Sequence, residues 1–161
     1  MVPYQGGGEM IHQVTFEKTV FNELPYKFEA GTPNMAGVAG LDEAIDFITE
    51  TGIDNIRGHE HRLLDHFAGK LTEIPQVRII GNAEEKTSVV SIEIDSIHPY
   101  DAGMVLDKLG FAVRTGHHCA QPLIDFYQLP GTLRASFGVY NTFEELDRFT
   151  EALKQVITLF E

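Results

Sequence analysis

The stretch that decides the fold is residues 87–94, TSVVSIEI, a short run rich in β-branched side chains. Such runs are typical of β-strands. A similar run, QVRII at residues 76–80, precedes it, and the polar segment GNAEEK at residues 81–86 lies between them. The sequence therefore predicts two strands that are joined by a turn at this point of the chain.

Strands and helices alternate downstream of this pair. Residues 98–110 predict a short helix that ends at Gly110, because glycine is the common residue just past a helix end. FAVRT at 111–115 and TLRASFG at 132–138 predict two further strands. Residues 120–130 between them predict a loop with a short helix.

The last helix begins after Thr142, because Thr142 and Glu145 have the spacing of a capping box. Its inward-facing residues are predicted to be Leu146, Phe149, Leu153, Val156 and Ile157. Strands that alternate with helices favour layers of the two. The predicted fold class is therefore α/β, with a small, largely antiparallel sheet and helices packed on one face.

The first third of the chain predicts less sheet and more helix. Adjacent glycines at 6–8 indicate a loop, residues 10–16 a strand, and the rest up to residue 33 extended or turning chain. Asn34 is the expected N-cap of a helix over residues 35–51, and a second helix follows over about 54–72.

Four apolar residues three and four positions apart define the first of these helices: Val38, Leu41, Ile45 and Ile48. We expect one domain over residues 1–161, made of an extended segment over 1–33 and an α/β small domain over 34–161.

Composition limits the possible partners. The 161 residues are 43% hydrophobic and 22% charged, which is typical of a globular domain, and the net charge is −12. This charge argues against binding to nucleic acid or to anionic membranes. No apolar run approaches the roughly 20 residues of a membrane span, and the N-terminus does not resemble a signal peptide. One cysteine and no internal disulfide fit a cytoplasmic protein.

The single cysteine, Cys119, lies among polar neighbours in RTGHHCAQPL, which begins at Arg114. A free thiol has a pKa of about 8.5, and a nearby imidazolium or guanidinium increases its thiolate fraction. His117, His118 and Arg114 supply such groups, and Arg134 on another predicted strand is a further candidate. Two interpretations remain open, a nucleophilic or sulfur-carrying cysteine and a structural cysteine flanked by surface histidines.

Two other chemistries are less well supported by the residues. His117 and Cys119 are zinc-ligand types, but the chain has no second Cys/His pair at metal spacing, and His59 and His61 diverge on a helix. We therefore predict no metal site. The chain lacks a G-x-S-x-G motif, and a thiol hydrolase would need an acid that orients His117 or His118.

Four stretches together resemble one enzyme family. RTGHHCAQPL resembles the cysteine loop of SUF-type (group II) cysteine desulfurases, which depend on pyridoxal 5'-phosphate (PLP) and belong to the class V aminotransferase family. PYQGGGEMI, KFEAGTPN and LRASFGVYNT resemble other segments of these enzymes in the same order. The resemblance runs from about Pro3 to the last helix. It implies the C-terminal domain of a fold-type I PLP enzyme.

The resemblance also implies residue roles. Cys119 would attack the sulfur of cofactor-bound L-cysteine and carry it as a persulfide for iron–sulfur cluster assembly, leaving L-alanine. Arg134 would hold the substrate carboxylate, a task suited to a guanidinium fork. Arg114 and His118 would shape the loop and its charge. Two alternatives are open for His118, a proton donor and a hydrogen-bonded structural residue.

For the cofactor, the resemblance implies that Gly31 and Thr32 contact the PLP phosphate of the partner subunit in a homodimer. A protein that accepts the sulfur is a further implied partner. The family's Schiff-base lysine follows a histidine and lies upstream of the glycine-rich segment, whereas no lysine here follows a histidine or precedes Gly6. We therefore expect this chain alone to bind no PLP.

Two accounts of the chain follow from this departure. In the first, it is a C-terminal, sulfur-handling part of a cysteine desulfurase without the large PLP-lysine domain. In the second, it is a naturally short, non-catalytic sulfur-accepting or binding module that pairs with a PLP-bearing chain. Whether the chain is an enzyme by itself stays open.

Overall fold

The computed structural model describes residues 1–81 and 83–161. Contacts divide the chain into two compact units, Met1–Thr51 and Gly52–Glu161. The expected division into residues 1–33 and 34–161 stays a prediction. None of the described helices is long and apolar enough to cross a membrane.

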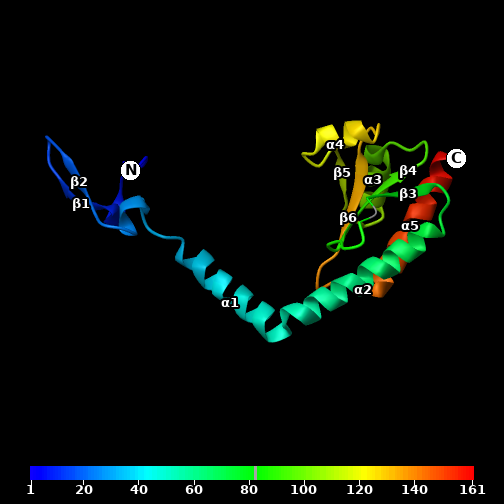
Figure 1. Cartoon of the computed structure of the whole chain (residues 1–161), viewed down its shortest axis with the longest axis horizontal. Helices are drawn as coiled ribbons and strands as arrows, with labels where there is room; N and C mark the ends of the chain where they lie inside the picture. The colour runs from blue at the N-terminus through cyan, green and yellow to red at the C-terminus, as the bar shows by residue number, and fades with distance from the viewer. Residues whose placement is uncertain (82) are drawn as a thin grey trace. The chain divides into compact units, whose positions relative to one another are not determined.

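The Met1–Thr51 unit contains a β-hairpin and one long helix (Figure 1). Strands β1 (Ile11–Val14) and β2 (Thr19–Phe21) pair antiparallel, and short 3-10 turns at Gly8–Met10 and Tyr26–Phe28 flank them. The sequence predicted the first strand but not the second. Three residues are too few to show a pattern, and the pairing depends on a turn in which the Thr15 N–H donates to the Lys18 carbonyl.

Helix α1 (Met35–Thr51) has the predicted bounds. The Asn34 side-chain oxygen accepts a hydrogen bond from the Gly37 N–H at 3.0 Å, which confirms the predicted N-cap. All residues of this unit are described, and Met10 is the only buried one. The apolar residues that predicted α1 are therefore exposed within the unit.

The Gly52–Glu161 unit contains a four-stranded sheet of strands β3 (Val77–Ile80), β4 (Val89–Ile94), β5 (Arg114–Gly116) and β6 (Thr132–Ser136). The strand order is β3-β4-β6-β5, and every neighbouring pair is antiparallel. The predicted antiparallel sheet is confirmed.

Strand β5 is shorter than the strand predicted for residues 111–115. Gly110 has φ of 87°, and the Phe111 N–H donates to the Leu106 carbonyl, so the backbone there still closes the preceding helix. Ladder pairing therefore begins only at Arg114.

Helices α2 (Ile53–Thr72), α3 (Pro99–Lys108) and α5 (Phe143–Phe160) share one core with the sheet (Figure 1). Alternate residues of β4, namely Val90, Ile92 and Ile94, point into this core, as period-2 geometry requires. Phe67 of α2 stacks on Phe149 of α5 with ring centroids 5.3 Å apart. The prediction of helices packed on one sheet face is confirmed for α2, α3 and α5.

The capping box of α5 is present as predicted. The Glu145 N–H donates to the Thr142 hydroxyl at 3.3 Å, and the Thr142 N–H donates to the Glu145 carboxylate at 2.9 Å. The Thr142 N–H and the Asn141 amide lower the pKa of Glu145 by stabilising its charged form. All five residues predicted to face inward on this helix are buried.

Candidate functional site

A row of four paired residues crosses the sheet on the face opposite the core. Ile80 of β3 pairs with Ser91 of β4, Ser91 pairs with Arg134 of β6, and Arg134 pairs with Arg114 of β5. Paired residues in an antiparallel sheet project to the same face. Two arginines therefore stand side by side on strands that are distant in sequence.

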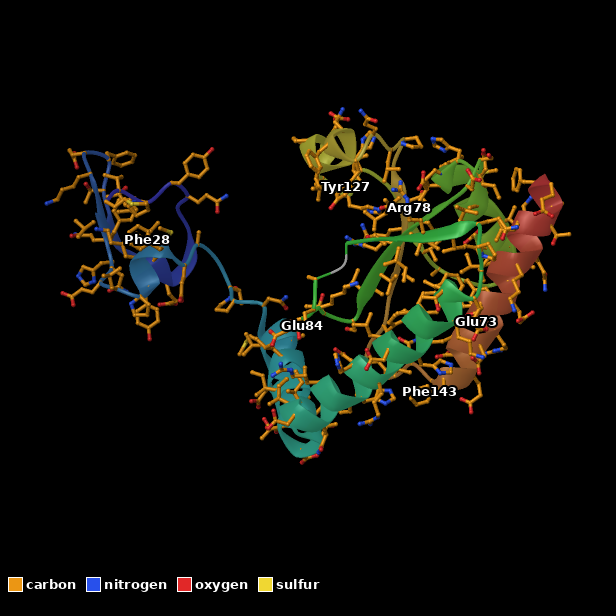
Figure 2. The ribbon with its side chains drawn as sticks, turned by 45° about the vertical axis from the view of Figure 1, so that its right-hand side comes forward. Phe28, Glu73, Arg78, Glu84, Tyr127 and Phe143 are labelled. Atoms are coloured by element: carbon orange, nitrogen blue, oxygen red, sulfur yellow. The ribbon has the colours of Figure 1, made fainter. Side chains whose placement is uncertain are left out.

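A cavity of about 180 Å³ lies over this row. Its polar lining includes Ser91, His118, Thr132 and Arg134. Helix α4 (Gln121–Phe126) forms an apolar wall with Leu123 and Ile124, and Tyr127 follows at its end (Figure 2). Helix α4 thus lines the face that the other helices leave open.

The two guanidinium groups have no carboxylate partner among the described residues. Among residues 1–81 and 83–161, neither Arg114 nor Arg134 forms an ion pair with a carboxylate. The Nε atom of Arg134 is buried, and it has no hydrogen-bond partner in the described part of the chain. Like charges directly opposite on a sheet are unfavourable, and an unpaired buried donor is costly. The cavity is therefore suited to a small anion such as a carboxylate.

The predicted cysteine loop begins where β5 ends. His118 and Cys119 have positive φ angles of 53° and 59°, which few non-glycine residues adopt. The Ala120 N–H donates to the His117 carbonyl at 2.9 Å and closes the turn before α4. Cys119 is exposed, while its neighbours His118 and Ala120 line the cavity. The loop therefore presents the thiol at the surface next to the cavity lining.

His118 is attached to the start of β6. Its Nε2 atom lies 3.1 Å from the Thr132 carbonyl oxygen and 3.0 Å from the Thr132 hydroxyl oxygen. Burial lowers the pKa of His118, the positive charges of Arg134 and Arg114 lower it further, and the bond to the Thr132 backbone opposes both. The ring is therefore biased toward its neutral form.

Close glycine contacts hold β5 in place. A Cβ on Gly131 would lie 3.0 Å from the Gly116 Cα atom, and a Cβ on Gly103 of α3 would lie 2.6 Å from the Thr115 Cγ2 atom. A side chain at either glycine would force the neighbouring atoms of β5 to shift. The strand before the cysteine loop is therefore fixed from two sides.

The predicted phosphate residues Gly31 and Thr32 belong to the Met1–Thr51 unit, and both are exposed. Gly31 has φ of 91°, and its N–H donates to the Gly7 carbonyl at 3.3 Å. A Cβ on Gly8 would lie 3.0 Å from the Gly31 Cα atom, so the glycine-rich segment packs on this turn. The two predicted glycine segments are thus in contact.

Three residues with side-chain hydroxyl groups line the cavity and were not predicted as site residues: Ser91, Thr132 and Tyr127. Thr132 is two residues before Arg134 on one strand, so the period of 2 was an available signal for it. Ser91 becomes a neighbour of Arg134 only through the strand register, which the sequence does not contain.

The family model for class V aminotransferases matches residues 1–149. A probable cysteine desulfurase of Xylella fastidiosa is 48% identical over 97% of this chain and 38% of its own length. The chain belongs to the class V aminotransferase family. A probable cysteine desulfurase of Streptomyces coelicolor is 45% identical over 98% of the chain, and again only 38% of the relative is covered.

Solved structures agree with this family. A cysteine desulfurase of Escherichia coli superposes with a TM-score of 0.86 at 34% identity, over 99% of this chain and 39% of that protein. A cysteine desulfurase of Thermococcus onnurineus superposes with a TM-score of 0.87 at 35% identity, over 97% and 39%. The predicted class V aminotransferase family is confirmed, and the chain spans less than two fifths of the length of these relatives.

Members of this family depend on PLP. The residues at the cavity fit an anionic substrate group but not a covalent cofactor anchor, because none of the described residues that line it is a lysine. The described residues also contain no cluster of three His, Cys, Asp or Glu side chains arranged for a metal.

Proposed function

We propose that the chain is the C-terminal, sulfur-handling part of a SUF-type cysteine desulfurase that converts L-cysteine to L-alanine. The sulfur would be held as a persulfide on Cys119 and passed to an acceptor protein for iron–sulfur cluster assembly in the cytoplasm. The observation that carries this proposal is the buried Nε atom of Arg134, which has no hydrogen-bond partner among the described residues. Arg134 lies in a small cavity that is also lined by His118 and Ala120, the neighbours of Cys119. The names of the relatives support the same reaction.

Arg134 is the proposed carboxylate-binding residue. Its buried Nε atom still has a proton to donate, and a carboxylate accepts two parallel bonds from one guanidinium. Arg114, opposite it across β5 and β6, adds a second positive charge on the same face. Together they would hold the amino acid by its carboxylate and leave its side chain free to meet the cysteine loop.

Cys119 is the proposed sulfur acceptor. Its exposure lets the thiol meet a substrate sulfur and then a second protein. The loop between β5 and α4 is attached to β6 by His118, so the thiol and Arg134 share one scaffold.

PLP, when bound, supplies the electron sink that cleavage of the substrate C–S bond requires. We propose that its lysine belongs to an upstream part of the enzyme, in accord with the coverage of about two fifths. Gly31 and Thr32 would contact the cofactor phosphate of the partner subunit in a homodimer. Both residues are exposed, and the Thr32 hydroxyl is a donor that suits that role.

A chimeric enzyme tests this function. Residues 1–161 replace the matching 38% of the Xylella fastidiosa relative, and alanine and sulfide are measured with PLP and L-cysteine. We expect both products, and a loss of about 100-fold or more in Cys119→Ser because the nucleophile is removed. Arg134→Lys keeps the charge but loses the fork, so KM for cysteine rises.

Three outcomes would count against the proposal. A chimera that binds PLP, judged by its visible absorbance, but forms no alanine would show that this chain lacks the sulfur-handling role. Alanine formed by the isolated chain with PLP would show that one of its own six lysines anchors the cofactor. Sulfur transfer to the isolated chain from a separate PLP-bearing chain would favour the short accepting module instead.

A further inference from the structure

We propose that Thr132 is a positioning residue of the cysteine loop, which holds the His118 ring with its Nε2 atom protonated and leaves Nδ1 as the proton-accepting nitrogen. The inference rests on the proposed function in one respect, because it takes the loop that carries Cys119 to be the reactive segment. It gives His118 the role of an acceptor, where the sequence left a proton donor and a structural residue as alternatives.

The geometry decides which ring nitrogen carries the proton. A backbone carbonyl can only accept, and the Thr132 carbonyl oxygen lies 3.1 Å from Nε2. An unprotonated Nε2 would place two lone pairs against each other at this distance. The Thr132 hydroxyl oxygen, 3.0 Å from the same atom, is a second acceptor on the same residue. Nε2 is therefore the donor, shared between two oxygens.

The remaining nitrogen follows from the charge of the ring. A neutral imidazole carries one proton, so a protonated Nε2 leaves a lone pair on Nδ1. Burial and the two neighbouring arginines both disfavour the doubly protonated ring. Among the described residues, Thr132 is the only hydrogen-bond partner of the His118 side chain. Nδ1 is thus available to take a proton from a thiol, by which the S–H bond breaks and an N–H bond forms.

Thr132 is well placed for this role. It is the first residue of β6 and only 1% exposed, so its backbone is fixed by the sheet. It stands two residues before Arg134 and therefore shares its face of the strand. One strand thus sets the orientation of both Arg134 and the loop histidine. A shift of Thr132 would move His118 relative to Arg134.

Nitrogen NMR of the full chain with 15N-labelled histidine tests the protonation directly. At a pH above the ordinary histidine range, a protonated ring nitrogen resonates far from an unprotonated one, and His118→Gln identifies the signals. His59 is an internal reference, because its Nε2 atom lies 2.9 Å from the Asn141 carbonyl oxygen. We expect His118 to show a protonated Nε2 and an unprotonated Nδ1. The reverse pattern would overturn the proposal.

Two matched variants test the hydroxyl. Thr132→Val keeps the shape but removes one acceptor, so exchange of the Nε2 proton with solvent should become about fivefold faster. Thr132→Ser keeps the hydroxyl and should stay within about twofold of the wild type. Equal exchange in both variants would show that the hydroxyl does not position the ring.

The tautomer measurement depends neither on the folding of a Thr132 variant nor on turnover. The wild-type spectrum decides the tautomer even if Thr132→Val fails to fold. The NMR sample contains no cofactor or substrate. The tautomer prediction and the prediction of chimera activity can therefore be contradicted independently. A merely structural threonine would alter stability in Thr132→Val but leave the Nε2 exchange rate of the folded protein unchanged.

Discussion

Helices α1 and α5 are nearly equal in length, with 17 and 18 residues, but they differ in what they bury. Helix α5 buries seven residues, whereas α1 buries none. Both have apolar residues at spacings of three and four, and both begin at a side-chain cap. Periodicity and capping therefore predict where a helix forms, but not whether this chain supplies the surface that covers it.

The same difference separates the two units. In Gly52–Glu161, three helices and a sheet enclose one core, so each apolar stripe has a partner. In Met1–Thr51, a short hairpin and α1 leave the stripe exposed. The chain covers less than two fifths of its relatives, which agrees with a unit whose partners lie in other parts of a longer protein.

The largest expected effect is the difference in stability loss between two leucine-to-alanine variants, one in each helix. Leu153→Ala in α5 removes a side chain that is 0% exposed, and should lower the free energy of unfolding of its unit by about 3 kcal/mol. Leu41 in α1 is 60% exposed, so Leu41→Ala should change the free energy of unfolding of its own unit by less than about 0.5 kcal/mol. Urea unfolding followed by circular dichroism measures both. Equal losses would mean that α1 is covered in solution.

The exposed stripe of α1 should also make the chain associate. We expect the wild type to bind a hydrophobic dye and to increase in mass with concentration, because contiguous apolar surface favours association. The double variant Val38→Glu/Ile45→Glu should reduce both. The control Ala36→Glu/Gly40→Glu adds the same charge on the other side of α1. A monomeric wild type that unfolds cooperatively and binds no dye would count against this expectation.

The sequence predicted those parts of the fold that depend on neighbouring residues better than those that depend on contacts with another element. Helix bounds and the capping box were local, so Asn34, Thr142 and Glu145 sufficed for α1 and α5. The shortened β5 was missed because Phe111 still bonds to the preceding helix. The resemblance implies a PLP enzyme, but the cavity gives no local support for the cofactor, because no lysine is among the described residues that line it.

The site was predictable in kind but not in geometry. Cys119 and Arg134 were identified from motifs, and their roles stay proposals. The pairing of Arg134 with Arg114 and Ser91 depends on strand register, which no single stretch of sequence contains. The bond from His118 to Thr132 is made in a loop with two consecutive positive φ angles. Both residues with these angles are non-glycine, so the sequence does not predict them.

Removing the two helix caps should have a smaller and again unequal effect. Thr142→Ala removes the hydroxyl that caps α5 and should destabilise the Gly52–Glu161 unit by about 1 kcal/mol. Asn34→Ala removes a cap of the same strength from α1, and we expect the thermal midpoint of the Gly52–Glu161 unit to stay unchanged. Calorimetry of the two variants measures this difference. A lower midpoint in Asn34→Ala would show that α1 and the second unit unfold together.

The smallest effect is a dependence on pH from the polar side of α5. The Asp147 carboxylate accepts a bond from His66 of α2 at 2.8 Å, and this bond, assisted by Lys70, lowers the pKa of Asp147 below its ordinary 3.8. A carboxyl with a depressed folded-state pKa stabilises the fold above its unfolded-state pKa, and this stability is lost as the pH falls through the folded-state value.

Asp147→Asn should therefore weaken the loss of stability between about pH 5 and about pH 3, measured as the shift of the urea midpoint. His66→Gln should weaken it in the same direction, because it removes the main cause of the depressed pKa while leaving the carboxyl in place. An unchanged pH dependence in both variants would show that this bond does not couple α2 to α5. The difference in stability between α5 and α1 would then depend chiefly on apolar burial.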